Sequence, residues 1–358
     1  MMIERLILSN FRNYQSQDIK FGGKVNILTG ENGQGKTNVL EAIYFLSFLR
    51  SFRTTCIDDL KKIGTAGFYL GAVLLSEKWN RLIEVENFDK KSLRIDKLPI
   101  KKSSDFIGLI KPIVFSHEDI KFITGTAKTR RRNLDIFISL LNKSYFSDLQ
   151  NYVAALKSRN FMLRLAEKDL KAIESYEPVL ASYGEKIVLE RYRVVSLLEE
   201  KADKIIKEIK GNEFSLKKKY FSRIKFEDSN RDCILRHMAQ ERQRDIKRGY
   251  SGVGPHLDDV ELYLNNRSLK SFGSIGECRI ASLCLKLAEA EIITEKDSQT
   301  SIALVDDVSG ELDAKTKDAF YKTIDRFSQV FLTFTKVQKE SYFEKSTNYF
   351  VKEGTVCC

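Results

Sequence analysis

Hydrophobic and polar positions follow different patterns at the two ends of this 358-residue chain and in its middle. Residues 67–76 and 81–88 alternate between apolar and polar side chains, which predicts an antiparallel hairpin. Residues 25–30 and 301–307 are mostly apolar runs, typical of central strands in an α/β sheet. From about residue 130 to residue 210, apolar residues recur three and four positions apart, which predicts long amphipathic helices. The pattern therefore predicts a mixed α/β unit built from both chain ends, with a mainly helical segment inserted between them.

The charge of the chain gathers in that inserted segment. Lys and Arg number 60 against 49 Asp and Glu, a net charge of +11. Residues 1–115 carry 18 − 12 = +6, residues 116–250 carry 29 − 20 = +9, and residues 251–358 carry 13 − 17 = −4. We therefore expect a head formed by 1–115 and 251–358 and a basic helical arm over 116–250. A basic surface favours nucleic acid or an acidic membrane, although lysine-rich proteomes also contain many mildly basic proteins.

Composition and motif spacing exclude several other classes of protein. Hydrophobic residues make up 42% and charged residues 30%, the balance of a globular protein. No apolar run approaches the roughly 20 residues of a membrane span, and the N-terminus lacks a signal-peptide layout. We therefore expect a cytoplasmic protein without a membrane partner. The 6 cysteines form no C-x-x-C pair and the 3 histidines do not cluster, so a zinc site is not expected.

A phosphate-binding loop occupies residues 30–37, which match G-x-x-x-x-G-K-[ST]. Its glycines permit backbone conformations in which successive N–H groups surround phosphate oxygens. Lys36 is expected to reach the β- and γ-phosphates, and the hydroxyl of Thr37 to bind Mg²⁺. The alternative is a glycine-rich turn with a solvated lysine. The preceding strand and the following helix favour an ATP site made by Gly30, Glu31, Asn32, Gly33, Gln34, Gly35, Lys36 and Thr37.

Two carboxylates end the late apolar strand. Asp306 is the expected Mg²⁺ partner, and Asp307 is the expected general base or water-orienting group. Together with Lys36, they form the predicted catalytic set; the alternative is two exposed acids at a strand end. Asp306 stands 306 − 36 = 270 positions after Lys36, so the two halves of one ATP site lie at opposite ends of the chain.

Two further segments resemble those of ABC-type ATPases. Ser274-Ile275-Gly276-Glu277 opens a helix before the second carboxylate strand, and Ser309-Gly310-Glu311-Leu312-Asp313 follows that strand. Alone, the first segment reads as an ordinary helix cap. In the ABC class, the corresponding serine and glycine contact the γ-phosphate held by the opposite subunit. The resemblance implies that Ser274 and Gly276 act in trans, and that the head combines a mixed sheet with an antiparallel subsheet.

The chain resembles more specifically the RecF family of bacterial recombination mediators, which is related to the SMC and RecN ATPases. The matching segments run in the family's order over nearly the whole chain. They are residues 10–14, 30–47, 50–53, 114–135, 156–164, 254–259, 271–277, 285–291 and 304–313. The resemblance implies a weak, DNA-stimulated ATPase that dimerises on ATP. It also implies binding of duplex DNA near single-strand gaps and loading of RecA together with RecO and RecR, in DNA repair, replication and the SOS response.

Some positions depart from the family or carry open alternatives. Ile275 and Glu277 stand where the family usually has glutamine, and His117 where it usually has proline. Thr333 lies where ABC transporters carry a histidine that senses the γ-phosphate, and is a weaker candidate for that switch. The resemblance places Arg12 and Asn13 near the nucleotide; a purely structural turn is the alternative.

The expected DNA surface is the basic arm. Its candidate DNA-contacting residues are Lys217, Lys218, Lys219, Arg130, Arg131 and Arg132. The three arginines have an alternative role as intramolecular anchors that pair with acids such as Asp135. Two other functions stay open at this point: the nucleotide-binding subunit of another ABC-type ATPase, and a DNA-binding module with a decayed ATP site.

Overall fold

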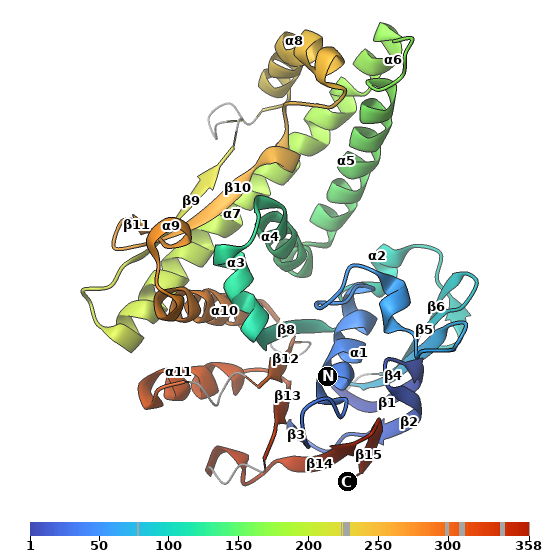
Figure 1. Cartoon of the computed structure of the whole chain (residues 1–358), viewed down its shortest axis with the longest axis vertical. Helices are drawn as coiled ribbons and strands as arrows, with labels where there is room; N and C mark the ends of the chain where they lie inside the picture. The colour runs from blue at the N-terminus through green and yellow to red at the C-terminus, as the bar shows by residue number, and fades with distance from the viewer. Residues whose placement is uncertain are drawn as a thin grey trace. The chain divides into compact units, whose positions relative to one another are not determined.

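The computed structural model describes residues 1–76, 79–222, 224, 230–297, 301–307, 312–336 and 341–357. The chain forms two compact units (Figure 1). Unit 1 joins Met1–Glu118 to Glu289–Cys358, and unit 2 is Asp119–Ala288. The expected arm, residues 116–250, starts three positions before the first residue of unit 2, Asp119. Unit 2 extends beyond the expected arm, to Ala288, because strand β10 after residue 250 pairs with strand β9 inside the arm.

Unit 1 contains an antiparallel sheet with the strand order β2-β1-β4-β5-β6-β7. The predicted hairpin is confirmed, since β4 and β5 pair antiparallel along their full length. In β4, every second residue from Phe68 to Leu74 is fully buried, which matches the period of two that a half-buried strand requires. The strands are β1 (Met2–Phe11), β2 (Tyr14–Lys20), β4 (Phe68–Leu75), β5 (Asn80–Asn87), β6 (Lys91–Ile95) and β7 (Leu98–Pro99).

A second, mainly parallel sheet in unit 1 has the order β15-β14-β3-β13-β12-β8. Every residue of β3 and β13 is buried, as continuous apolar runs in parallel sheets predict. Its strands are β3 (Val25–Thr29), β8 (Lys111–Ser116), β12 (Ser301–Asp306), β13 (Gln329–Phe334), β14 (Thr347–Lys352) and β15 (Thr355–Cys357). Because β3, β13 and β12 run parallel, their carboxyl ends meet at one edge. That edge carries the chemistry described below.

Helix α1 contacts strands of both sheets of unit 1, and eleven of its thirteen residues are buried. It therefore forms the core between the sheets, which explains its apolar composition on every side. The helical elements of this unit are α1 (Lys36–Phe48), η1 (Ile57–Leu60), α2 (Ser103–Phe106), η2 (His117–Ile120, which ends in unit 2), α11 (Ala314–Ile324) and η5 (Ser341–Phe343). The predicted fold class, an α/β head with an antiparallel subsheet and a mainly helical insertion, is confirmed.

Unit 2 is built around the 34-residue helix α7, which contacts α5, α8 and strand β9 (Figure 1). Pro178 stands in its first turn and Gly211, with φ of 120°, ends it. The helices are α3 (Lys121–Thr124), α4 (Ala127–Leu141), α5 (Lys143–Met162), α6 (Leu170–Ser175), α7 (Glu177–Lys210), α8 (Arg231–Arg248), η3 (Pro255–Leu257), α9 (Leu269–Phe272) and α10 (Ile275–Asp297, which continues into unit 1). The strands β9 (Leu216–Phe221), β10 (Asp259–Leu264) and β11 (Arg267–Ser268) form a sheet in the order β11-β10-β9.

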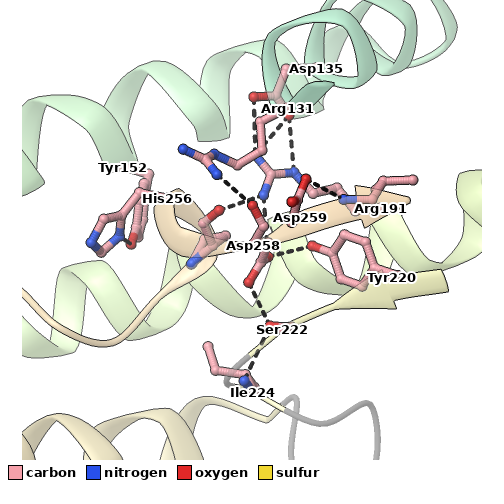
Figure 2. A network of polar contacts seen from close by, with 12 residues as sticks. Arg131, Asp135, Tyr152, Arg191, Tyr220, Ser222, Ile224, His256, Asp258 and Asp259 are labelled. Atoms are coloured by element: carbon pink, nitrogen blue, oxygen red, sulfur yellow. Dashed lines mark hydrogen bonds and ion pairs between the residues drawn. The ribbon is translucent and has the colours of Figure 1, made fainter. Parts of the chain in front are cut away.

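A buried polar network joins the elements of unit 2 (Figure 2). The guanidinium of Arg191 on α7, with a side chain 2% exposed, donates to Asp135 on α4 at 2.8 and 3.0 Å and to Asp258 at 3.3 Å. Asp258 also accepts hydrogen bonds from the hydroxyls of Tyr220 on β9 and Ser222. Burial raises the pKa of Asp258, and the charge of Arg191 opposes that rise. The network therefore ties α4, α7 and β9 to the segment that leads into β10.

His256 lies in the same segment in one defined tautomer. Its Nε2 is 3.0 Å from the carbonyl oxygen of Ser251, which can only accept, so Nε2 carries the hydrogen. Its Nδ1 then accepts from the hydroxyl of Tyr152 at 2.7 Å. Burial lowers the pKa of His256 to about 4, so the ring is neutral at physiological pH.

Candidate functional site

The loop between β3 and α1 has a backbone that only glycine tolerates at two positions. Gly30 has φ of 153°, and a Cβ there would stand 2.3 Å from the carbonyl oxygen of Val351. Gly35 has φ of 119°, and a Cβ there would meet Asn13 Nδ2 and the Tyr14 hydroxyl at 2.8 Å. Both glycines are therefore required by backbone conformation and by space. Gly33, with φ of 81°, has open space around it, and its glycine serves the backbone turn alone.

Lys36, the first residue of α1, lies across this loop. Its Nζ donates to the carbonyl oxygens of Gly30 at 2.7 Å and Glu31 at 2.8 Å, and the residue is only 7% exposed. Burial lowers the pKa of Lys36, while the carboxylates of Asp307 and Asp306 act in the opposite direction. A positive charge is thus held inside the loop, where an anion would replace the two carbonyl oxygens as its partner.

The loop and the late strand meet through one hydrogen bond. The hydroxyl of Thr37 donates to Asp306 Oδ1 at 2.8 Å, although the two residues are 269 positions apart. The hydroxyl of Thr333 on the intervening strand β13 donates to the same oxygen at 2.9 Å. Asp306 is the last residue of β12, and it faces Thr333 in the strand register. The parallel sheet therefore brings together the residues that the sequence predicted to form one site.

The residues at this edge fit a magnesium ion held jointly with a nucleotide. Among the described residues, no group of three or more His, Cys, Asp or Glu side chains forms a metal cluster. Mg²⁺ typically takes one or two protein oxygens, several waters and phosphate oxygens. Because Thr37 gives its hydrogen to Asp306, the lone pairs of its oxygen remain available to a metal, and Asp306 Oδ2 is left for the water shell. Thr37 and Asp306 are the residues that could hold it.

Asp307 adopts a strained backbone just beyond β12. Its φ is 55°, in the left-handed region that non-glycine residues rarely occupy. Its backbone N–H donates to the hydroxyl of Thr333 at 3.1 Å. Its carbonyl oxygen lies 3.1 Å from Nε2 of His117, the residue that follows β8. Thr333 is 1% exposed, and its hydroxyl bonds the carboxylate of Asp306 and the backbone N–H of Asp307. It therefore holds both acids in place, a role that the sequence-based expectation of a phosphate-sensing switch did not include.

Arg12 and Asn13 support the loop from the turn between β1 and β2. The side-chain amide of Asn13 donates to the carbonyl oxygen of Gln34 at 2.8 Å and accepts from Asn38 at 2.8 Å. The guanidinium of Arg12 donates to both carboxylate oxygens of Glu41, at 2.7 and 2.8 Å. Asn13 thus holds the loop, and Arg12 holds α1.

Glu41 was not among the residues predicted from the sequence. It is fully buried within α1, and a carboxylate at a core-facing position of an apolar helix was the signal that could have found it.

Besides Asn13, the C-terminal hairpin also supports the loop, since the backbone N–H of Glu353 donates to the side chain of Gln34 at 2.7 Å. Glu31 and Asn32 are exposed at the rim of the loop.

Ser274 caps α10 in unit 2 through a reciprocal pair of hydrogen bonds with Glu277. The Ser274 hydroxyl accepts from the Glu277 N–H at 3.2 Å, and the Glu277 carboxylate accepts from the Ser274 N–H at 2.7 Å. A Cβ at Gly276 would meet nothing within 4 Å, so neither space nor a left-handed backbone requires glycine there. Ser274 and Glu277 therefore form the ordinary helix cap that was the alternative interpretation of this segment. The cap does not explain why residue 276 is a glycine. Residues 309–311 of the expected turn lie outside the described residues.

The candidate DNA-contacting residues separate by burial. Lys217 and Lys219 are exposed on one face of β9, whereas Lys218 is 8% exposed because strand alternation turns it inward. Arg130 is 1% exposed and forms an ion pair with Asp259 at 2.7 Å. Burial therefore removes Lys218 and Arg130 from the candidates. The anchor reading is correct for Arg130, with Asp259 as partner in place of the expected Asp135.

The two neighbours of Arg130 are less enclosed. Arg131 is partly buried and donates to the carbonyl oxygen of Asp258 at 2.5 Å (Figure 2). Burial lowers its pKa, with the nearby charge of Arg191 acting in the same direction. Arg132 is likewise half-buried. Helix α8 adds exposed cations that the sequence analysis did not single out: Arg231, Arg236, Arg244, Lys247 and Arg248.

Comparison with known proteins gives consistent matches over the full length. The family model described as "RecF/RecN/SMC N terminal domain" matches residues 2–355. The chain is 33% identical to the DNA replication and repair protein RecF of Clostridium novyi over 99% of each chain. It is 34% identical to the protein of that name from Streptococcus thermophilus, over 99% of this chain and 98% of the other.

Solved structures agree with these matches. A structure of the recombination mediator protein RecF with ATP, in the RecFOR pathway, superposes with a TM-score of 0.90 at 30% identity, covering 99% of this chain and 96% of that one. An Smc head bound to the C-winged helix domain of ScpA, at 15% identity and a TM-score of 0.58, shares the fold alone. Within the described part of the chain, no helix is long and apolar enough to cross a membrane.

Proposed function

The chain belongs to the RecF branch of the RecF/RecN/SMC family, and on that basis we propose that it is an ATP-dependent DNA-binding protein of recombinational repair and replication. The proposal is supported by relatives named DNA replication and repair protein RecF and by a solved structure of the recombination mediator protein RecF with ATP. The observation in this chain that carries the proposal is the 2.8 Å hydrogen bond from Thr37 to Asp306. It joins a phosphate loop to a metal-binding carboxylate across 269 positions.

The proposed ATP site uses the residues at the edge of the parallel sheet. The N–H groups of residues 30–37 surround the phosphates, and Lys36 moves its Nζ from the carbonyl oxygens of Gly30 and Glu31 to the β- and γ-phosphates. Thr37 and Asp306 hold Mg²⁺, which neutralises charge on the phosphate oxygens when it is bound. Asp307 orients the attacking water and accepts its proton. The products are ADP and inorganic phosphate.

We further propose that ATP joins two copies of the chain. Ser274 and Gly276 of one copy contact the γ-phosphate bound by the other, using the hydroxyl of Ser274 and the backbone N–H of Gly276 at the start of α10. The glycine at position 276, which the fold itself does not require, supports a close approach by an outside group. Nucleotide shared in this way stabilises only the dimer, and hydrolysis therefore reverses the association.

The proposed DNA surface is the exposed part of the basic arm, with Lys217 and Lys219 as the first candidates. Duplex DNA near single-strand gaps is the expected ligand. Phosphate contacts of this kind make affinity fall as salt rises. RecR and RecO are the proposed partners, in loading RecA in the cytoplasm; these assignments come from the family.

A DNA-stimulated ATPase assay tests the proposal. We expect slow hydrolysis that rises on addition of gapped duplex DNA, and loss of ATP binding in Lys36→Ala. An unchanged rate in Lys36→Ala would assign the activity to another site or a contaminant. Binding of DNA with no dependence on nucleotide would instead favour a module whose ATP site has decayed.

A further inference from the structure

The strained backbone of Asp307 is held from both sides by side chains of neighbouring strands. A left-handed conformation costs an ordinary residue about 1–2 kcal/mol, so surrounding contacts must maintain it. The N–H of Asp307 donates to Thr333 on β13, and its carbonyl oxygen faces His117 at the end of β8. These two contacts fix the peptide groups before and after its Cα, and thereby the direction of its side chain.

Thr333 serves the two acids with one hydroxyl. Its oxygen accepts the N–H of Asp307 at 3.1 Å, and its hydrogen goes to Asp306 Oδ1 at 2.9 Å. The residue is 1% exposed, so water does not substitute readily for either bond. Serine retains this combination of donor and acceptor, whereas valine has the same shape and lacks both.

His117 acts on the opposite peptide group. Because a carbonyl oxygen only accepts, the Nε2 atom 3.1 Å from the Asp307 oxygen must be the protonated nitrogen. His117 is exposed, so its replacement does not disturb the core of unit 1.

We infer that Thr333 and His117 are positioning residues that hold Asp307 in the orientation required for hydrolysis. This inference rests on the proposed ATPase function. The hydroxyl of Thr333 bonds Asp306 and Asp307, and His117 Nε2 bonds the carbonyl oxygen of Asp307, so these bonds act on the acids at the strand end. Their loss is therefore expected to lower kcat more than ATP affinity. A misplacement of about 1 Å in a catalytic group can lower a rate by roughly 100-fold. We therefore expect kcat to fall by roughly 10- to 100-fold in Thr333→Val.

The experiment compares ATP hydrolysis and fluorescent-ATP binding in the full chain and its variants. Thr333→Val is expected to lower kcat with little change in ATP affinity, and Thr333→Ser is expected to restore kcat. His117→Ala is expected to lower kcat in the same way, by a smaller factor. The matched control is Thr323→Val, because Thr323 is a buried threonine on α11 whose hydroxyl donates to the carbonyl oxygen of Ala319 in its own helix.

A double substitution separates positioning from general damage. If His117 acts through Asp307, then His117→Ala causes no further loss of kcat in an Asp307→Asn background, whereas Thr333→Val keeps a smaller effect there through its bond to Asp306. Full kcat in Thr333→Val, an equally large loss from Thr333→Val in the parent and in the Asp307→Asn background, or a Thr333→Ser variant as slow as Thr333→Val would overturn the role of Thr333. Unchanged kcat in His117→Ala, or a further loss from it in the Asp307→Asn background, would overturn that of His117. A parent chain that neither binds nor hydrolyses ATP would instead refute the proposed function.

Discussion

Removing the guanidinium of Arg191 should destabilise the arm much more than removing that of Arg193, an exposed arginine on the same helix. Arg191 is 2% exposed, and it donates to both oxygens of Asp135, to Asp258 and, at 2.6 Å, to the carbonyl oxygen of Pro255. Arg191→Met leaves the carboxylate of Asp258, with a side chain 0% exposed, without its charged partner. Breaking a buried pair from one side typically costs about 3–5 kcal/mol, which is the loss we expect at neutral pH.

The pH dependence identifies the cause of that loss. Burial already raises the pKa of Asp258, and Arg191 opposes the rise. Without Arg191, the pKa of Asp258 in the folded chain rises further above its unfolded value. The folded state then binds the proton more tightly than the unfolded state, so the deficit shrinks as pH falls. Asp258→Asn in the Arg191→Met background should recover part of the stability for the same reason.

Urea titration with two probes measures this effect. Circular dichroism at the helix band reports chiefly the helices of unit 2, whereas the single tryptophan, Trp79, lies in unit 1. We expect Arg191→Met to shift the dichroism transition more than the fluorescence transition. The control is Arg193→Met, since Arg193 lies two positions along α7 with a side chain 55% exposed, and exposed ion pairs contribute about 0–1 kcal/mol. A loss below about 1 kcal/mol in Arg191→Met, or a deficit that grows at low pH, would refute the reasoning.

Three further predictions address catalysis, DNA binding and pH. Asp307→Asn should bind ATP and accumulate as a nucleotide-bound dimer in gel filtration, and rapid hydrolysis by this variant would exclude the catalytic role of Asp307. Replacing Lys217 and Lys219 by glutamine should reduce the slope of log affinity for duplex DNA against log salt by roughly 2, whereas Lys322→Gln, an exposed lysine of unit 1, should leave it unchanged. Because the pKa of His256 is about 4 in the folded chain, the unfolded state takes up the proton first as pH falls. The chain should therefore lose up to roughly 3 kcal/mol of stability between pH 6.5 and pH 4. The urea midpoint of His256→Gln should depend less on pH over that range.

The sequence predicts the fold, and it singles out candidate ATP-site residues that meet at one sheet edge, because these signals are local. A glycine-rich loop between an apolar strand and a helix, and two acids at the end of another apolar strand, identify themselves without tertiary information. Parallel strands then place their carboxyl ends at one edge, as found for Thr37 and Asp306.

The support of this site depends on contacts between distant strands, which no local pattern contains. Thr333 meets Asp306 and Asp307 only because β13 lies beside β12, and His117 meets Asp307 only because β8 lies on the other side of β12. Among the basic residues, three consecutive lysines or arginines look alike in sequence, whereas strand alternation buries Lys218 and helix packing buries Arg130. The extent of unit 2 was missed for a similar reason, because β10 pairs with β9 after a helix of 18 residues.

The central claim is that one ATP site is completed by two copies of the chain, and mixing two inactive variants tests it most directly. Lys36→Ala keeps Ser274 and lacks the phosphate-binding lysine; Ser274→Arg keeps the lysine and lacks the serine. A mixed dimer of the two contains one intact site. We predict that neither variant forms a dimer with ATP alone, and that their equimolar mixture does so in mass photometry. Dimerisation of Ser274→Arg alone with ATP, or a mixture that stays monomeric while the parent chain dimerises, would contradict the claim.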